Sequence, residues 1–338
     1  SEEMLDEICN LAANLDIKVK EKKIFNLKKI SPSTLIGKGM LEKIKEEINL
    51  LKINLFIFNC SLSPAQQKNL ENYLKIKVTD RVGIIIEIFA KRALSKEGKL
   101  QVELAELIYR KSRLVRAWTH LERQRGGTTF IGGPGELQIE LDRRLIQEKI
   151  NRIKKKLKDV SKRRSLQRKK RNKNNFKTFA LVGYTNAGKT LLFNKLTKRN
   201  QSSQNKLFET LDTKISKIYL DSKKTIGMID TVGFIKNIPT QLIESFKATL
   251  EEVNKSDYII NVVDINDIDF KDKISTTVEI LKETGVAHKK INEMITVYNK
   301  IDISDKQYDN IENKTYVSAL TGKGIDELKI IIDSMTNI

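Results

Sequence analysis

The stretch from residue 178 to 194, TFALVGYTNAGKTLLFN, constrains the fold of this 338-residue chain more than any other segment. It combines a run typical of a buried strand, the spacing G-x-x-x-x-G-K-T and a helical pattern, which is the setting that a phosphate-binding loop requires. Gly183 and Gly188 allow backbone amides to surround phosphates without interference from a Cβ atom. We expect Lys189 to reach the β- and γ-phosphates of a nucleotide and the Thr190 hydroxyl to bind Mg²⁺. The other residues of the predicted loop are Tyr184, Thr185, Asn186 and Ala187.

Two later motifs predict which base the nucleotide carries. MITVYNKID reads as a strand that ends in Asn299, Lys300 and Asp302. A carboxylate accepts two hydrogen bonds, which suits the N1–H and amino group of guanine and not the N1 acceptor of adenine, so Asp302 should select guanine. We expect Asn299 to face the O6 and N7 edge and the aliphatic stem of Lys300 to lie along the base. YVSALTGKG supplies three further predicted contacts, Ser318, Ala319 and Leu320, and the Ala319 amide is expected to approach guanine O6. The order of these motifs after the phosphate loop favours GTP over ATP.

Two segments between these motifs are expected to respond to the γ-phosphate. TIGMIDTVGF directs Asp230 toward Mg²⁺ and Gly233 toward the γ-phosphate. LFETLDT supplies Thr210 as a second hydroxyl on Mg²⁺, with Thr213 as a competing candidate. The predicted catalytic residues are Lys189, Thr210 and Gly233, and the predicted metal ligands are Thr190, Thr210 and Asp230. Further nucleotide contacts are expected from Phe208, Glu209, Leu211, Asp212, Thr231 and Val232.

Phe234 stands where a switch hydrolase is expected to carry a glutamine. A phenyl ring has no donor or acceptor to orient a water molecule, so slow intrinsic hydrolysis is expected. Asn186 is placed as in potassium-dependent GTPases, which this loop resembles and in which such an asparagine helps to hold a monovalent cation beside the phosphates. Bound K⁺ would neutralise developing charge. The alternative is that Asn186 braces the loop by hydrogen bonding.

Residues 1–94 predict a small α/β domain. LEKIKEEINLLK has a helical period, whereas LFIFNC and GIIIEIFA are short apolar runs that read as buried strands. LIGKGML, at residues 35–41, places glycines on both sides of Lys38 ahead of a helix, but it lacks the full spacing of a phosphate loop. A plain turn and an anion-binding turn therefore both remain open for this segment.

Residues 95–172 predict an antiparallel helical hairpin, and residues 176–338 predict the nucleotide-binding domain. Two heptad-like apolar seams flank the glycine-rich loop GGTTFIGGPGE, so the helices should fold back on each other. The expected seams are Leu100, Leu104, Leu107, Leu114, Trp118 and Leu121, then Ile139, Ile146, Ile150, Ile153, Leu157 and Val160. The glycine-rich loop could cradle a phosphate, but a flexible hairpin tip is the favoured alternative. Basic residues on the shoulders of the hairpin suggest RNA contact at the tip: Arg116, Arg123, Arg125, Arg143 and Arg144.

The net charge of +20 is concentrated in the second helix of this hairpin, where nearly every second residue from 149 to 177 is Lys or Arg. A solvated helix face, a contact surface for a phosphate backbone and an anionic membrane surface are the alternatives. The scarcity of acidic partners at i,i+4 spacing favours the phosphate backbone.

Several classes of protein are excluded by what the chain contains. Cys9 and Cys60 fit neither a disulfide framework nor a metal-binding pattern, and His120 and His288 are too few for a histidine-based catalytic constellation. There is no apolar run of about 18 residues, so no membrane span is expected. The start of the chain lacks the pattern of a secretory signal. The sparse cysteines favour a reducing cytoplasm.

The chain as a whole resembles the HflX family of translation-associated GTPases. The resemblance lies in the nucleotide motifs GYTNAGKTLLFN, LFETLDT, DTVGFI, NKID and SAL, and in the upstream stretches IGKGMLEKI, SPAQQKNLE and GGPGELQIELDRR. The resemblance extends from about residue 31 to 338 and implies a P-loop GTPase domain, in which a mostly parallel sheet carries helices on both faces. It also implies a cytoplasmic GTPase that uses GTP, GDP and Mg²⁺, binds the large ribosomal subunit and its rRNA, and splits or rescues stalled ribosomes. We expect a monomer. The alternatives are an RNA-remodelling NTPase with a second nucleotide site through Lys38, and a membrane-tethered signalling GTPase.

Overall fold

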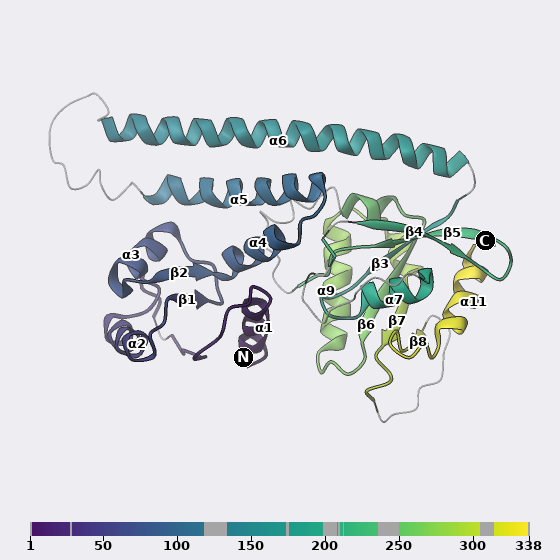
Figure 1. The fold of residues 1–338 in the computed structure, drawn as a ribbon, viewed down its shortest axis with the longest axis horizontal. Helices are drawn as coiled ribbons and strands as arrows, with labels where there is room; N and C mark the ends of the chain where they lie inside the picture. Colours follow the sequence, from purple (N-terminus) through teal and green to yellow (C-terminus); the bar gives the residue numbers. More distant parts are fainter. Residues whose placement is uncertain are drawn as a thin grey trace. The chain divides into compact units, whose positions relative to one another are not determined.

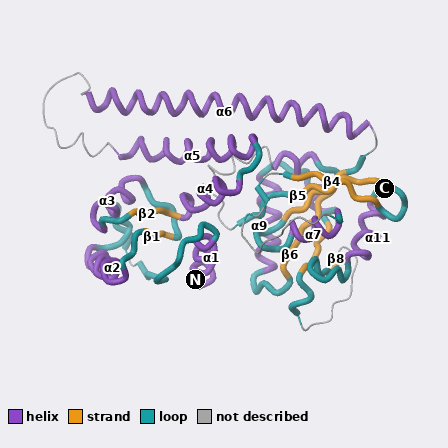
Figure 2. Tube along the Cα trace, in the orientation of Figure 1, coloured by secondary structure: helices purple, strands orange, loops and turns teal. Residues whose placement is uncertain are grey.

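The computed structural model describes residues 2–27, 29–117, 134–173, 176–198, 208, 210–211, 213–235, 250–304 and 314–336 (Figures 1 and 2). It divides into two compact units, Ser1–Lys91 with Val102–Lys156 and Arg92–Gln101 with Leu157–Ile338. No helix in the described ranges is both long enough and apolar enough to cross a membrane.

A six-stranded sheet forms the centre of the second unit, with the order β4-β5-β3-β6-β7-β8 (Figure 1). β4 runs antiparallel to β5, and every other neighbouring pair is parallel. The parallel order brings the carboxyl ends of β3, β5, β6, β7 and β8 to one edge, where a ligand is expected in an α/β sheet. The strands are β3 (Thr178–Val182), β4 (Lys214–Tyr219), β5 (Thr225–Asp230), β6 (Tyr258–Asp264), β7 (Ile295–Asn299) and β8 (Lys314–Tyr316).

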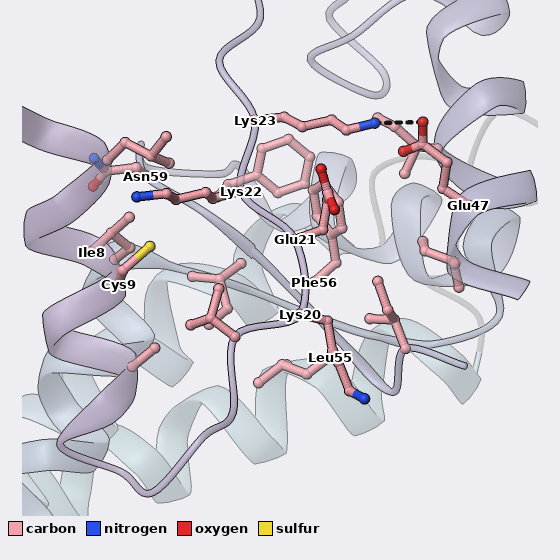
Figure 3. A pocket seen from close by; sticks show the side chains of 18 of the residues that line it. Ile8, Cys9, Lys20, Glu21, Lys22, Lys23, Glu47, Leu55, Phe56 and Asn59 are labelled. Carbon is pink, nitrogen blue, oxygen red and sulfur yellow. Dashed lines mark hydrogen bonds and ion pairs between the residues drawn. The ribbon is translucent and has the colours of Figure 1, made fainter. Parts of the chain in front are cut away.

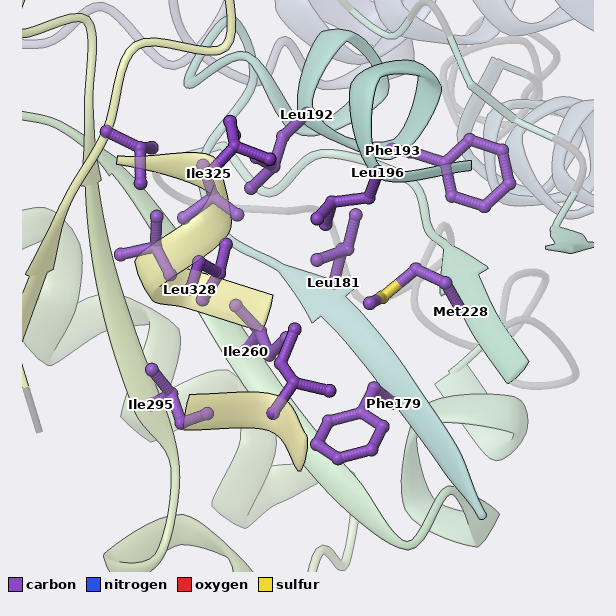
Figure 4. Close-up of a cluster of buried hydrophobic side chains, with 14 of the residues drawn as sticks. Phe179, Leu181, Leu192, Phe193, Leu196, Met228, Ile260, Ile295, Ile325 and Leu328 are labelled. Atoms are coloured by element: carbon purple, nitrogen blue, oxygen red, sulfur yellow. The ribbon is translucent and has the colours of Figure 1, made fainter. Parts of the chain in front are cut away.

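Helices cover both faces of this sheet because successive strand residues point to opposite sides. Helices α7 (Lys189–Thr197) and α11 (Ile325–Met335) share one buried cluster with Phe179 and Leu181 of β3 (Figure 4). Helical residues 250–255, α9 (Phe270–Glu283) and α10 (His288–Asn292) pack against the other face, which carries Ala180 and Val182. The predicted mostly parallel sheet with helices on both faces is therefore confirmed.

The first unit contains a small α/β fold around the parallel pair β1 (Leu55–Phe58) and β2 (Lys77–Asp80). Helix α3 (Pro64–Leu74) connects these strands, and its start is stabilised by a capping box between Ser63 and Gln66. Residues of α2 (Lys38–Leu51), α3, β1 and β2 share one buried cluster, which includes Ile44, Leu70 and Val78. Helix α1 (Glu2–Ala13) precedes these elements.

The prediction that GIIIEIFA forms a strand is wrong, because this run lies within helix α4 (Arg81–Arg92). An unbroken apolar run does not distinguish a buried strand from a buried helix. Ile84, Ile85, Ile86 and Ile88 are all buried, so this helix is covered around most of its circumference. The Asp80 carboxylate accepts a hydrogen bond from the Gly83 amide (2.9 Å) and so satisfies a free donor in the first turn.

Helices α5 (Lys96–Ala117) and α6 (Pro134–Lys173) run in opposite directions, as expected for a hairpin. Lys111 of α5 bonds to Gln147 of α6, and Glu97 pairs with Arg164 (2.7 Å), so early residues of one helix lie beside late residues of the other. Ile150 and Ile153 of the second predicted seam are buried. The proposed RNA-binding tip, with Trp118, Leu121, Arg123 and Arg125, lies outside the described residues.

Candidate functional site

The phosphate loop occupies residues 183–188, between the end of β3 and the start of α7. Gly183 has a φ of 135° and Gly188 a φ of 87°, a region that side-chain-bearing residues rarely adopt. A Cβ atom at Gly183 would overlap the backbone oxygen of Val262, and one at Gly188 would overlap the Asn299 amide nitrogen. Both glycines are therefore required by backbone angle and by space.

Lys189 is buried at the first position of α7 and points back into this loop. Its Nζ atom donates to the carbonyl oxygens of Gly183 (3.0 Å) and Tyr184 (2.6 Å). Burial lowers the pKa of Lys189 to about 8, and the nearby charge of Asp230 partly opposes this shift. An anionic phosphate beside the ammonium group would favour its protonated form, so the position suits triphosphate binding.

The three predicted metal ligands meet at one point. Thr210 Oγ1 donates to Asp230 Oδ2 (2.7 Å), Thr190 Oγ1 donates to the same oxygen (3.1 Å), and the two hydroxyl groups are 2.8 Å apart. Burial raises the pKa of Asp230, while hydrogen bonds from the two threonines and the charge of Lys189 oppose the shift. Within the described ranges, the other Asp230 oxygen is buried without a hydrogen-bond partner. Hydroxyl and carboxylate oxygens are the donors that Mg²⁺ prefers, so the set fits this ion.

The segment after β5 is hydrogen-bonded to the phosphate loop. The Phe234 amide donates to the Gly183 carbonyl (3.0 Å), and the Thr185 amide donates to the Phe234 carbonyl (2.8 Å). Gly233 packs so closely that a Cβ atom there would lie 2.8 Å from Thr185 Cα. Phe234 is only 1% exposed and belongs to the buried cluster that contains Tyr184. Its ring is thus a core side chain and is not placed to orient a water molecule.

The segment LFETLDT is described only in part. Thr210 is buried beside Asp230, and Phe208 and Leu211 are buried on either side of it. Phe208 has a φ of 54°, so the chain turns sharply just before Thr210. Glu209 and Asp212, two of the predicted contacts, lie outside the described residues.

Asn299, at the end of β7, joins the phosphate loop to the base motif of Ser318, Ala319 and Leu320. Its Nδ2 atom donates to the Ala187 carbonyl (2.9 Å), and its Oδ1 atom accepts from the Ala319 amide (2.9 Å). The Ala319 amide, which the sequence analysis assigned to guanine O6, is therefore used inside the protein in this structure. Asp302 is exposed at the same edge, where a base can reach it.

The remaining predicted contacts differ in burial. Thr231 and Val232 are buried after β5, and the Thr231 hydroxyl donates to the Leu181 carbonyl (2.6 Å). Ser318 is buried and its hydroxyl accepts from the Thr321 amide (3.0 Å), whereas Leu320 is 67% exposed. An exposed leucine beside the base motif is available to contact a ligand.

Sequence reasoning missed Asp264, the last residue of β6, and Asn266, two residues later, both of which contact Lys300. The available signal was an acid as the last residue of the buried strand YIINVVD and an amide two residues later, at the edge where parallel strands end.

A cavity of about 580 Å³ lies in the first unit, between α1, the extended segment 17–27 and β1 (Figure 3). Its walls are largely apolar, with Ile8 and Phe56 among them, and Lys38 is not one of its lining residues. Gly37, before Lys38, has a φ of −72°, which any residue adopts. This geometry matches a plain turn before a helix, the first of the two alternatives for LIGKGML.

One member of the basic run on α6 is not free to bind a phosphate backbone. Arg164 pairs with Glu97 (2.7 Å) and lies 3.9 Å from Glu252, and Glu252 is only 3% exposed. One turn earlier, the Ser161 hydroxyl donates to Glu251 (3.0 Å). These contacts fasten this part of α6 to helical residues 250–255.

Three family models match the chain in succession. Their descriptions are GTP-binding GTPase N-terminal over residues 2–90, GTP-binding GTPase Middle Region over 92–171, and 50S ribosome-binding GTPase over 178–300. The last match contains the phosphate loop and extends as far as Asn299 and Lys300.

Whole-chain comparisons agree with these matches. GTPase HflX of Magnetococcus marinus is 45% identical over 330 residues, covering 96% of this chain and 76% of the relative. GTPase HflX of Lacrimispora saccharolytica is 42% identical over 337 residues, covering 98% and 78%. A GTP-binding protein from the hyperthermophilic archaeon Sulfolobus solfataricus, solved in complex with GDP, aligns over 100% of this chain and 96% of its own, with 26% identity and a TM-score of 0.51. The expected family and the expected hydrolysis of GTP are confirmed, and the chain belongs to the HflX family of GTPases.

Proposed function

We propose that this GTPase is a cytoplasmic, monomeric switch that binds the large ribosomal subunit and its rRNA and acts in splitting or rescuing stalled ribosomes. The observation that carries the proposal is the exposed face of α6. Its exposed positions between residues 152 and 163 are almost all basic, while Ile153 on the opposite side is buried. The exposed basic residues are Arg152, Lys154, Lys155, Lys156, Lys158, Lys162 and Arg163. A cationic stripe of this length suits a phosphate backbone.

The second unit also offers a route from the nucleotide to this helix. Residues 250–255 follow the Gly233 segment in the chain, and Glu251 and Glu252 contact Ser161 and Arg164 of α6. A change in the Gly233 segment on loss of the γ-phosphate would displace residues 250–255, and these contacts would pass that displacement to α6. This connection supports a switch whose affinity for the ribosome depends on the bound nucleotide.

Each residue of the nucleotide site has a proposed role in hydrolysis. Thr190, Thr210 and Asp230 would hold Mg²⁺, which when bound neutralises charge on phosphate oxygens. Lys189 would bind the β- and γ-phosphates, and the Gly233 amide would bind the γ-phosphate. Phe234 adds no group that activates water, so we propose slow intrinsic hydrolysis that the ribosome stimulates.

Asn186 is the proposed ligand for K⁺. It is exposed in the phosphate loop with a φ of 63°, and no hydrogen bond of its side chain is present in the described part of the chain. This supports K⁺ binding over a bracing role. Single-turnover hydrolysis should be faster in KCl than in NaCl at equal ionic strength, and Asn186→Ala should abolish that difference. A cation effect that survives in Asn186→Ala would exclude Asn186 as the ligand.

Co-sedimentation with purified large subunits tests the ribosomal role. Pelleting should be stronger with a non-hydrolysable GTP analogue than with GDP, because the γ-phosphate would bind the Gly233 amide and hold that segment in a position that GDP does not favour. Lys189→Met, which should lose nucleotide affinity, serves as the matched control and should pellet equally in both conditions. Equal pelleting of the wild-type protein with both nucleotides would contradict the proposed switch.

A further inference from the structure

The end of β6 and the turn after it hold the base motif of Asn299 and Lys300 at three points. Lys300 Nζ lies 2.8 Å from Asp264 Oδ2, and Asn266 Nδ2 donates to the Lys300 carbonyl (2.8 Å). The Ile265 amide donates to the Asn299 carbonyl (3.2 Å). Both the backbone and the side chain of Lys300 are therefore fixed by residues 264–266.

The backbone of Lys300 needs such support. Its φ of 68° places it in the left-handed region, which a residue with a long side chain adopts only when its surroundings enforce it. The hydrogen bond to its carbonyl and the ion pair at the end of its side chain act on the two ends of the same residue. Together they set the direction of the aliphatic stem between them.

The Asp264 carboxylate is itself oriented within the turn. Its Oδ1 atom accepts from the Asn266 amide (3.1 Å), which leaves Oδ2 to face Lys300. The Asp264 and Lys300 side chains are 23% and 25% exposed. A partly exposed ion pair contributes little to stability, so its main consequence is the position of the lysine.

We infer that Asp264 is a positioning residue for guanine nucleotides, acting through Lys300. It holds the lysine stem in place before the base arrives, so that binding does not have to immobilise a flexible side chain. The inference rests on the proposed assignment of Asn299, Lys300 and Asp302 to the base. It adds Asp264, which contacts Lys300, to the determinants of nucleotide affinity.

The first test replaces the carboxylate with an amide of the same shape. Asp264→Asn keeps an acceptor for the Asn266 amide and removes the charge that holds Lys300. Its affinity for fluorescently labelled GDP should fall about threefold to tenfold, because ordering a free lysine on binding costs that much. At saturating GTP, kcat should stay at the wild-type value while KM rises, because the phosphate site is unchanged.

Asp267→Asn is the matched control. Asp267 forms an ion pair with Lys273 in the same turn, at similar exposure, and that pair does not include Lys300. This variant should change GDP affinity by less than about twofold. Equal losses in Asp264→Asn and Asp267→Asn, or a lowered kcat in Asp264→Asn alone, would overturn the inference.

A double-mutant cycle tests whether Asp264 acts through Lys300. Lys300→Met keeps an unbranched stem and removes the ammonium group, so adding Asp264→Asn should weaken GDP binding by less than about twofold further. A full, additive loss would overturn the inference. Asp302→Asn tests the base assignment separately through preference for xanthosine over guanosine triphosphate. If Asp302→Asn shifts the preference toward xanthosine triphosphate while Asp264→Asn and Asp267→Asn bind GDP equally well, the base assignment stands and only the role of Asp264 is refuted.

Discussion

Replacing Gly188 with alanine should disconnect the phosphate loop from the base motif. Gly188 is the residue before α7 and has a φ of 87°. A Cβ atom there would overlap Asn299 Nδ2, the atom that donates to the Ala187 carbonyl. Asn299 would have to move and would also lose its bond from the Ala319 amide.

The expected cost has two parts. Placing alanine in the left-handed region costs about 1–2 kcal/mol. The Ala187 carbonyl and the Ala319 amide, left unpaired, cost about 1–3 kcal/mol each, which brings the total to roughly 3–8 kcal/mol. Domains of ordinary stability have about 5–15 kcal/mol in all, so Gly188→Ala should be close to the limit of folding.

Gly285→Ala provides a matched control, since Gly285 has a φ of 81° and no atom closer than 3.7 Å to an added Cβ. Gly285→Ala should lose only the stability that corresponds to placing alanine in the left-handed region. Urea unfolding of the nucleotide-free proteins, followed by circular dichroism, should place Gly188→Ala at least about 2 kcal/mol below Gly285→Ala. GDP affinity should fall at least about tenfold in Gly188→Ala alone. If the two variants prove equally stable and bind GDP equally well, the Asn299 bridge is not what requires a glycine.

Three further predictions concern charge. The pKa of Lys189 falls from 10.5 in the unfolded chain to about 8 in the fold, so its burial destabilises the nucleotide-free protein below pH 8, and this cost is relieved as pH rises toward 10.5. Relative to wild type, the free energy of unfolding of Lys189→Met should therefore be higher at pH 7 than above pH 10.5 by on the order of 3 kcal/mol, and this difference should shrink between pH 8 and 10.5; a pH-independent difference in urea titrations would contradict the cause. Asp302→Asn should weaken GTP binding by about 2 kcal/mol or more and favour xanthosine triphosphate, whereas unchanged preference in a binding competition would reject the assignment. Replacing Lys155, Lys156 and Arg163 with glutamine should reduce the slope of log affinity for rRNA against log salt by up to about 0.9 per lost contact, and an unchanged slope in a folded variant would identify a solvated face.

Local sequence was sufficient for the phosphate loop and much of the fold class. Gly183 and Gly188 lie within one six-residue loop, and each is required there by its own backbone angle. The apolar run of β3 predicts a strand that is buried on both sides. The same local rules failed for GIIIEIFA, because an unbroken apolar run satisfies a buried strand and a buried helix equally well. Which of the two forms depends on what surrounds the run.

The sequence by itself was enough to predict which residue types would meet phosphate, metal and base, because those requirements are chemical and are written in short motifs. Only the tertiary structure decided which partners those residues take inside the protein. Asn299 bonds to a residue 112 positions away, and Asp264 reaches Lys300 from the neighbouring strand. Arg164 looks like any other cation of its basic helix, yet it pairs with Glu97 and approaches the buried Glu252. Such pairings arise where separate segments are brought within about 3 Å of each other, a distance that the order of residues along the chain does not encode.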